Sequence, residues 1–402
     1  MDRQNKSFYA INLYSMIDQS NKRMLSRTYA YCRNEHSDIN SIINCMFNKI
    51  GNNSKQNNCN LKYIKYYNPD NAELTDGVST WQGMCEYKNN QIIICGTTDP
   101  SPTTGSGLIY FGNISCNDNN QSSVIFSVPD SEYTSCYGPR YNFTTQEFTL
   151  VGSYNNPSDS NTYGFLFRGT LPNLNNPDNY ITKMQNPTYN YPMTFVHSTD
   201  GNFAVGASGN FVNNNQQANL KAWIYDITQK SYTPYQFNNS IYTTIYGIIL
   251  NPDDSYTIVG GYSNGINTQF VSGFIADMIY NTTTYTLSFK NETSLTLDKN
   301  NNVITHFEGI SRTNDPNIYT LAGDGLSATN LTIGSAFIIK RNTIDKRFDI
   351  IKSTSVDYAC SANTNGVTSS NSVLGNTIVG YFVAPSITSS FQCIIDWNKV
   401  NN

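Results

Sequence analysis

Short apolar segments, rather than long helical stripes, dominate the pattern of hydrophobic and polar positions along this chain. A run of β-branched and aromatic residues that ends in glycine occurs six times, at intervals of 54 to 63 residues. The copies are QIIICG, FTLVG, FAVG, YTIVG, YTLAG and NTIVG, ending at Gly96, Gly152, Gly206, Gly260, Gly323 and Gly380. A period of this size indicates an array of repeated structural units.

Each copy is accompanied by three further segments. A second apolar run follows it, as in GLIYFG from Gly107 and SGFIAD from Ser272, and a more alternating run such as YTLSFKN completes the unit. Because the first two runs are almost continuously apolar and are flanked by Asn, Gly, Ser and Pro, they read as strands covered on both faces. A glycine precedes the first run by 13 or 14 residues, at Gly83, Gly138, Gly247, Gly309 and Gly366, with Met193 in the third unit. It predicts an innermost strand whose backbone crowds its neighbours.

Four strands per unit, ordered from inner to outer, predict an all-β fold in which six four-stranded antiparallel sheets form a ring. The pattern resembles the β-propeller superfamily from about Leu61 to Trp397, with YTIVGGYS and SGFIADMIY as the best-formed unit. The resemblance is architectural, because the Trp-Asp pair of WD40 repeats and the double glycine of kelch repeats do not recur. It implies a six-bladed propeller whose ligands enter at one mouth of the central channel, and it does not select an activity.

The ends of the chain predict how the ring closes. The last unit stops after its third strand, at FQCIIDW, and the segment LKYIKYY at residues 61–67 is expected to pair with it as the missing outer strand. The predicted propeller domain therefore covers residues 61–402. Residues 1–60 lack the repeat and are expected to form a small N-terminal appendage, with a degenerate extra blade as the alternative.

Composition narrows the classes of partner. Charged residues make up 13% of the chain and the net charge is −4, so neither nucleic acid nor an anionic membrane is an expected partner. No apolar stretch has the length of a membrane span, and no signal peptide is visible near residue 1. Asn-X-Ser/Thr triplets, such as those at Asn142 and Asn281, fit the expected extracellular or surface-associated glycoprotein, but a chain this rich in Asn, Ser and Thr more readily produces them by chance.

The residues that bind metals and cofactors give little signal. The three histidines, His36, His197 and His306, fall in different units, and no cysteine pair has zinc-site spacing, so neither a metal nor a cofactor is expected. No nucleotide-binding glycine loop follows a strand. Among the nine cysteines, Cys85 with Cys95 and Cys360 with Cys393 are candidate disulfides, and buried free thiols are the alternative.

Aligning the units on the inner-strand glycine brings polar and aromatic side chains to the expected channel mouth. These candidate binding residues are Thr80, Trp81, Gln82, Tyr137, Arg140, Tyr191, Tyr246, His306, Phe307, Glu308, Asn363 and Asn365. Aromatic faces supply apolar contact area, while amides and hydroxyls fix orientation, so the set suits a sugar or a peptide loop. Arg140 would either hold an anionic group or pair with a neighbouring acid.

These residues predict a non-enzymatic recognition propeller that binds a protein or glycan at one face of the ring. The alternative is a propeller hydrolase or lyase acting on a polysaccharide or glycoside. In that case His306 and Glu308 would be acid and base, because residues two apart on an extended strand share one face. A purely structural assembly protein is the third possibility.

Overall fold

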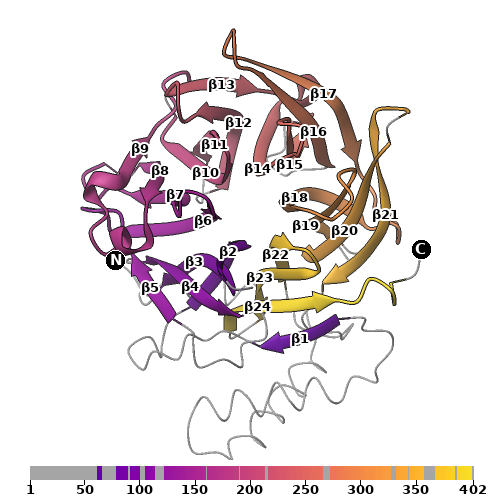
Figure 1. Cartoon of the computed structure of the whole chain (residues 1–402), viewed down its shortest axis with the longest axis horizontal. Coiled ribbons are helices and arrows are strands. Elements are labelled where there is room, and N and C mark those ends of the chain that lie inside the picture. The colour runs from indigo at the N-terminus through magenta and orange to yellow at the C-terminus, as the bar shows by residue number, and fades with distance from the viewer. Residues whose placement is uncertain are drawn as a thin grey trace, which may run out of the picture.

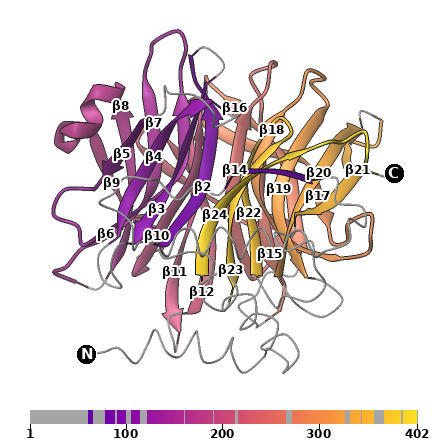
Figure 2. The same ribbon diagram turned by 90° about the horizontal axis from the view of Figure 1, so that it is seen from below.

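The strands form a ring around a central channel, as the computed structural model shows (Figure 1). The residues described are 61–65, 78–88, 91–99, 105–113, 122–159, 161–189, 191–212, 216–265, 272–326, 332–342, 344–356, 367–384 and 387–400. Seen from the side, the strands run between the two faces of a thick disc (Figure 2). The all-β propeller arrangement of antiparallel sheets predicted from the repeat is confirmed.

The strands take four positions between the channel and the rim. The innermost are β2 (Val78–Glu86), β6 (Tyr133–Tyr141), β10 (Met193–Asp200), β14 (Tyr242–Leu250), β18 (Val303–Arg312) and β22 (Val367–Leu374). The second strands are β3 (Gln91–Asp99), β7 (Phe148–Asn155), β11 (Phe203–Val212), β15 (Tyr256–Ser263), β19 (Ile318–Leu326) and β23 (Thr377–Ala384). The third are β4 (Ser106–Asn113), β8 (Thr162–Gly169), β12 (Gln216–Asp226), β16 (Ser272–Asn281), β20 (Thr332–Asn342) and β24 (Ile387–Ile395). The outermost are β5 (Ser122–Phe126), β9 (Ile181–Met184), β13 (Ser231–Tyr235), β17 (Thr286–Leu295), β21 (Arg347–Val356) and β1 (Leu61–Lys65).

The number of sheets differs from the expected six. Among the described residues, four sheets have four strands each and a fifth has eight strands, because β6–β9 and β10–β13 are joined. The junction is one parallel residue pair, Thr162 with Met193. The two halves also pack against each other through a buried cluster that includes Val151, Leu166 and Trp223.

The first and last described strands lie side by side. β1 pairs antiparallel with β24, with Leu61 opposite Ile395 and Tyr63 opposite Cys393. The edge of β24 is thereby paired rather than exposed, which removes a site for unwanted strand addition. The predicted appendage, residues 1–60, lies outside the described residues.

The hydrophobic cores lie between neighbouring sheets, which explains the nearly continuous apolar runs. All eight residues of β15 are buried, and the cluster around Phe307 and Phe337 combines β14–β16 with β18–β21. The outer strand β17 alternates exposed and half-buried residues along its whole length, because one of its faces meets solvent. Burial on both faces therefore makes the inner strands apolar throughout.

The glycine that ends each repeated run has a specific steric reason. Each second-strand glycine faces an inner-strand backbone carbonyl that a Cβ atom would overlap, as Gly260 faces the oxygen of Thr244. The other pairs are Gly96 with Thr80, Gly152 with Ser135, Gly206 with Phe195, Gly323 with His306 and Gly380 with Ser369. The repeat signature therefore marks a close approach of two backbones.

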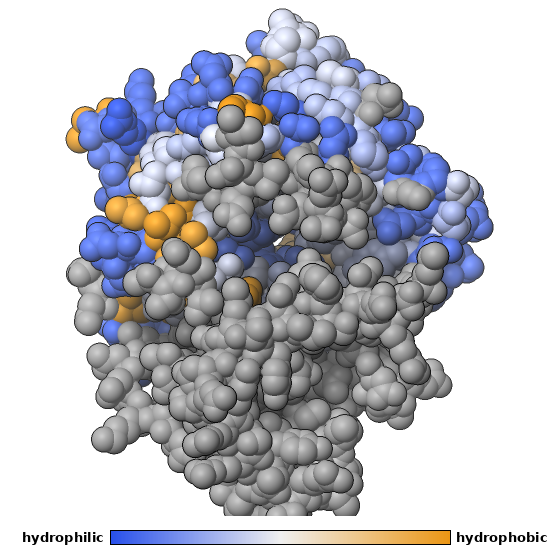
Figure 3. All heavy atoms as spheres, turned by 180° about the vertical axis from the view of Figure 1, so that it is seen from behind, coloured by the Kyte–Doolittle hydropathy of each residue, from blue (hydrophilic) through white to orange (hydrophobic). Residues whose placement is uncertain are grey.

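The remaining described elements are short. They are the 3₁₀ helices η2 (Leu171–Asn175), η3 (Asp178–Tyr180) and η4 (Phe237–Asn239). No helix in the described part of the chain combines the length and hydropathy needed to cross a bilayer. On the face seen in Figure 3, the described surface is mostly hydrophilic with small apolar patches. Exposed large apolar residues in the described part of the chain include Phe143, Tyr285 and Ile344.

Candidate functional site

Every inner strand carries a β-bulge at the same level of the channel. In β14, Ile245 pairs with Gly260 and Gly247 pairs with Val259, so Tyr246 is left as the extra residue. The corresponding residues of all the inner strands are Gln82, Tyr137, His197, Tyr246, Glu308 and Asn371. We call these the bulge ring. Because a bulge re-aims its extra residue, it gives each inner strand one side chain for a common site.

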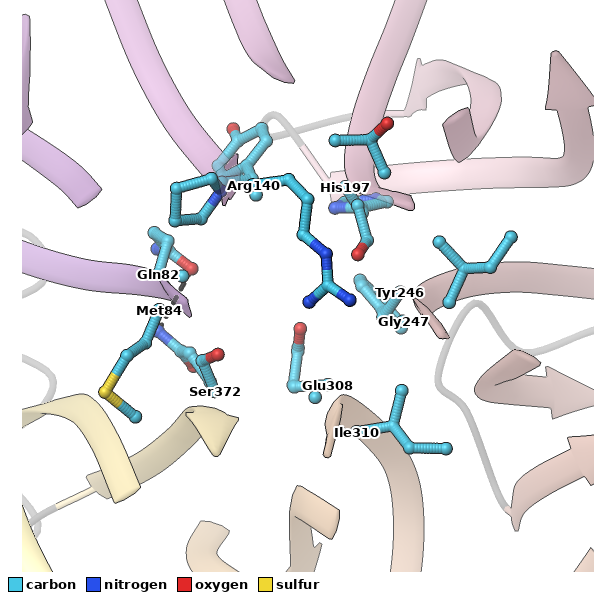
Figure 4. Close-up of a pocket in the computed structure, with 18 residues that line it drawn as sticks. Gln82, Met84, Arg140, His197, Tyr246, Gly247, Glu308, Ile310 and Ser372 are labelled. Carbon is cyan, nitrogen blue, oxygen red and sulfur yellow. Dashed lines mark hydrogen bonds between the residues drawn. The ribbon is translucent and has the colours of Figure 1, made fainter. Parts of the chain in front are cut away.

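The bulge ring surrounds one cavity on the channel axis. The cavity has a volume of about 60 Å³, which is room for a few water molecules, and all members of the bulge ring line it together with Met84 and Arg140. In Figure 4, the Arg140 guanidinium and the Glu308 carboxylate point toward each other across its centre. A cation and a carboxylate from opposite sides of the ring therefore share a small polar space.

His306 and Glu308 form a close acid and base contact beside this cavity. His306 Nε2 lies 2.7 Å from Glu308 Oε1, and both side chains are largely buried, with exposed fractions of 16% and 19%. The other ring nitrogen, Nδ1, lies 3.0 Å from Thr305 Oγ1, whose hydroxyl donates to the carbonyl of Asp324. Thr305 can then only accept, so Nδ1 carries a hydrogen. The pair therefore holds one shared proton between Nε2 and the carboxyl group.

Neighbouring charges set the protonation of this pair. Burial by itself lowers the pKa of His306, but the hydrogen bond and charge of Glu308 and the charge of Asp324 raise it above its ordinary value overall. Asp324 is on β19 opposite His306, and its own pKa is raised to about 6, chiefly by burial. The contact with Glu308 therefore favours the imidazolium form of His306.

Arg140 is held in place by a buried acid of the next inner strand. Its Nε donates to Asp200 Oδ1 at 3.0 Å and its Nη2 to Oδ2 at 2.6 Å. Asp200 also accepts from the backbone N–H groups of Gly201 and Leu250. Arg140 therefore pairs with a neighbouring acid, as one of the two expectations had it, and it also lines the cavity.

Aromatic rings fill one side of the bulge ring. The centroid of the His197 ring lies 5.5 Å from the ring centroid of Tyr137 and 4.4 Å from that of Tyr246. The ring centroids of Tyr246 and His306 are 5.1 Å apart. Burial lowers the pKa of His197 to about 3, with a further contribution from His306. His197 is therefore a neutral ring at neutral pH. Burial raises the pKa values of both tyrosines, so their hydroxyls stay protonated.

Several predicted site residues lie elsewhere. Gln82, Tyr137, Arg140, Tyr246 and Glu308 line the cavity, as expected. His306 is placed beside it by its bond to Glu308. Trp81 and Phe307 instead belong to the cores between sheets, because successive strand residues point to opposite faces.

The other corrections concern loops and strand starts. Tyr191 precedes β10 and stacks on Tyr189 at 5.9 Å, away from the cavity-lining residues. The side chain of Thr80 is only half-buried and lies outside the lining set. Asn363 and Asn365 fall outside the described residues.

Two members of the bulge ring, His197 and Asn371, are absent from the predicted set. In the third and sixth units only two residues connect the inner and second strands, Gly201 with Asn202 and Gly375 with Asn376. Each glycine has positive φ, +56° and +59°, as tight hairpins favour. These hairpins are shorter than the others, so counting back from Gly206 or Gly380 by the usual spacing overshoots the bulge. The constant signal is the second-strand glycine, which always pairs with the residue before the bulge.

Metal and thiol chemistry have little support in the described residues. No group of three or more His, Cys, Asp and Glu side chains there is arranged to hold a metal ion. Cys85, Cys95, Cys136 and Cys393 are buried free thiols. Cys85 lies opposite Ile93 rather than Cys95, so that candidate disulfide is not formed, and Cys360 lies outside the described residues.

Comparison with known proteins gives the fold and little else. No protein-family model matches the sequence, and no curated protein matches it significantly. A protein of unknown function from Dyadobacter fermentans has a similar structure, with a TM-score of 0.52 and 9% identity over 84% of this chain and 100% of its own.

Two enzymes match less well. A GH43_1 enzyme from Xanthomonas citri has a TM-score of 0.37 and 7% identity over 83% of this chain and 89% of its own. The catalytic domain of a Coprinopsis cinerea GH62 α-L-arabinofuranosidase has a TM-score of 0.39 and 10% identity over 83% of this chain and 95% of its own.

The expectation of a non-enzymatic recognition module is corrected by these findings. It rested on the low charge density of the chain, on the predicted cup of amides and aromatic rings, and on the absence of a complete catalytic set. In the structure, His306 and Glu308 are hydrogen-bonded to each other beside the cavity, and Arg140 lies opposite Glu308. The enzymatic alternative is favoured.

Proposed function

We propose that this chain is an enzyme that cleaves a polysaccharide or glycoside, with Glu308 as the base and His306 as its acidic partner. The observation that carries the proposal is the 2.7 Å contact between His306 Nε2 and Glu308 Oε1 beside the central cavity. A carboxylate held by an imidazolium can accept a proton from a substrate and return it within one catalytic cycle.

The lining of the cavity supports a carbohydrate substrate. Tyr137 and Tyr246 offer aromatic faces and protonated hydroxyls, while Gln82 and Asn371 offer amide groups. Such a mixture of apolar area and oriented polar groups suits a sugar ring. The cavity of about 60 Å³ accommodates the reacting edge of a ring, so the rest of the saccharide would lie toward the channel mouth.

The arrangement of the acid and base favours elimination over hydrolysis. Glycoside hydrolysis uses two carboxyl groups about 5 to 10 Å apart, one on each side of the scissile bond. Here Glu308 and His306 touch, and Asp324 is on the strand next to them. Elimination needs only one base beside the acidic carbon and a cation that stabilises the charge that develops.

Arg140 supplies that cation and defines the preferred substrate, a sugar that carries a carboxylate. Its guanidinium would pair with this carboxylate and acidify the adjacent C–H bond. Glu308 removes that proton, the C–H electrons form a C=C bond, and the C–O bond to the neighbouring sugar breaks. The departing oxygen then takes the proton from Glu308, so the reaction consumes no water.

The experiment compares acidic and neutral polysaccharides. Polygalacturonate and alginate are tested against xylan and arabinan, with reducing ends and the ultraviolet absorbance of the new C=C bond followed together. We expect both signals on an acidic polymer and a loss of about 10² to 10⁴-fold in rate for Glu308→Gln. The matched control is Glu147→Gln, which alters a carboxylate paired with Arg168 at the surface. Full activity in Glu308→Gln, or no cleavage of any of these polymers, would contradict the proposal.

We also propose that the ring is best counted as six blades. The eight-stranded sheet is joined at its middle by one residue pair, and a buried cluster separates its halves as in the other interfaces. The bulge ring supports this count, because each four-stranded group contributes one member.

A further inference from the structure

Asp324 lies behind the proposed acid and base pair, in a network that joins the second strand β19 to the inner strands β22 and β2. Its side chain is buried, with 4% of the residue exposed. Oδ1 accepts the N–H of Ser370 at 2.9 Å, and Oδ2 lies 2.7 Å from the hydroxyl of Ser369. That hydroxyl also lies 2.6 Å from Asn371 Oδ1.

The amide of Asn371 has only one consistent orientation. Its Nδ2 donates to the carbonyl of Trp81 at 2.7 Å and to Gln82 Oε1 at 3.0 Å. Flipping the amide would place two oxygens against each other at the Trp81 carbonyl. The Oδ1 atom of Asn371 therefore faces Ser369 and needs a donor there.

If Asp324 were ionised, this network would have one hydrogen too few for its short oxygen–oxygen contacts. The Ser369 hydroxyl has one hydrogen but faces two oxygen acceptors, Asp324 Oδ2 and Asn371 Oδ1, at hydrogen-bond distance. If Ser369 donates to one, the other short oxygen pair has no hydrogen between its atoms. A second proton, on Asp324, satisfies both contacts.

We propose that Asp324 carries a proton in this network and donates it to Ser369, which donates in turn to Asn371. The chain of donors then runs in one direction, from Asp324 through Ser369 and Asn371 to Gln82, and ends in two members of the bulge ring. Asp324 is in this sense a positioning residue, because its protonation fixes the amides that line the cavity.

The surrounding groups agree with a neutral Asp324 at mildly acidic pH. Facing it are His306 and Glu308 from β18, Tyr246 from β14 and Tyr381 from β23. Burial raises the pKa of Asp324 to about 6, the charge of His306 lowers it and that of Glu308 raises it. Burial also raises the pKa of both tyrosines, to about 12 for Tyr381, so neither supplies a competing anion.

The proton also has a consequence for the proposed reaction, and only this step rests on the proposed function. Below about pH 6, where Asp324 is neutral, Glu308 is the sole anion beside His306, so the imidazolium charge is directed to the proposed base. Ionisation of Asp324 would divide that charge between two carboxylates and release the Ser369 hydroxyl from Asn371.

The first test observes the proton directly and needs no substrate. Aspartate carboxyl carbons are labelled with ¹³C in the full chain and titrated by NMR, with Asp324→Asn identifying the signal by its loss. We expect a carboxyl group that titrates near pH 6 in the wild type. A midpoint at the ordinary Asp value, near pH 4, would overturn the proposal.

The second test asks whether Asn371 competes for the Ser369 hydrogen. In Asn371→Ala the hydroxyl is released to Asp324, so the midpoint should fall by about one pH unit. An unchanged midpoint would show that the network is not coupled. If this variant does not fold, the comparison is made with Asn371→Asp. There the new carboxylate makes the same demand on the hydroxyl, so the midpoint should stay at or above its original value, and a fall would contradict the coupling.

Catalytic failure is separable from failure of this network. A titration near pH 6 without cleavage of any polysaccharide would reject the proposed function and retain the protonated Asp324. Cleavage by a protein whose Asp324 titrates normally would reject the network alone.

Discussion

The carbonyl oxygen of Thr244 lies against the Cα atom of Gly260, in the space that a Cβ atom at position 260 would need. The bulge at Tyr246 follows directly, because Ile245 pairs with Gly260 and the next paired residue is Gly247. The glycine of the repeat is thus the partner of the bulge. It permits the local geometry that delivers one side chain per inner strand to the cavity.

Replacing Gly260 by alanine should therefore destabilise the protein strongly. The added methyl group would meet a backbone carbonyl, which cannot move aside as a flexible side chain can, so we expect a loss of about 3 kcal/mol or more. Urea denaturation measures it. Gly375→Ala is the matched control: its Cβ would meet nothing within 4 Å, and only the positive φ of +59° opposes it. We expect about 1 kcal/mol there, and equal losses in the two variants would contradict the steric explanation.

Much of the ring could be predicted from the sequence, because its cause is repeated along the chain. Apolar runs covered on both faces, and a glycine required at each close approach, leave a periodic trace at residues such as Gly152 and Gly260. The number of separate sheets could not be predicted. It depends on the single residue pair Thr162 and Met193, where the N–H of Thr162 donates to the carbonyl of Pro192, and this contact has no sequence signature.

The site was less accessible to sequence reasoning, for two physical reasons. The hairpin between the inner and second strands differs in length from unit to unit. An alignment of the units on a fixed spacing therefore missed His197 and Asn371 as members of the bulge ring. Strand alternation then sends Trp81 and Phe307 into the cores rather than the channel. His306 and Glu308 were found because they share one extended strand, but Asp324 comes from the next strand and becomes their neighbour only through pairing.

The charge of Glu308 should be visible in the titration of His306. In Glu308→Gln the hydrogen bond to a carboxylate and its charge are both lost, and these are what oppose the effect of burial. The pKa of His306 should therefore fall below its wild-type value. Histidine side-chain ¹⁵N NMR measures the change, with signals assigned from single His variants. A pKa that stays constant or rises would show that Glu308 does not control His306.

Arg140 and Asp200 should behave as a coupled clamp between two inner strands. Asp200 has only 6% of its side chain exposed, so Arg140→Met leaves a buried carboxylate without its cation and should cost about 2 to 3 kcal/mol. Asp200→Asn should cost less, because an amide is easier to bury. A double-mutant cycle measured by urea denaturation should give about 1 to 2 kcal/mol of coupling. Additive losses would mean that the clamp contributes nothing beyond its separate parts.

His197 should make the protein more sensitive to acid. Burial lowers its pKa to about 3, against 6.5 for an unperturbed histidine, so the folded state binds this proton less readily than the unfolded state. Its contribution to stability is therefore complete above pH 6.5 and is lost as the pH falls from 6.5 toward 3. Between pH 7 and pH 4 the loss should approach about 3 kcal/mol, as an upper value because the ring is partly exposed to the cavity. The matched variant is His197→Phe, because its ring can still pack against Tyr137 and Tyr246. In urea denaturation the wild type should lose stability relative to this variant as the pH is lowered. Asp324→Asn should show the opposite trend, because the raised pKa of Asp324 stabilises the wild type below pH 6. A constant difference between the wild type and His197→Phe at every pH would mean that His197 is not held neutral by the fold.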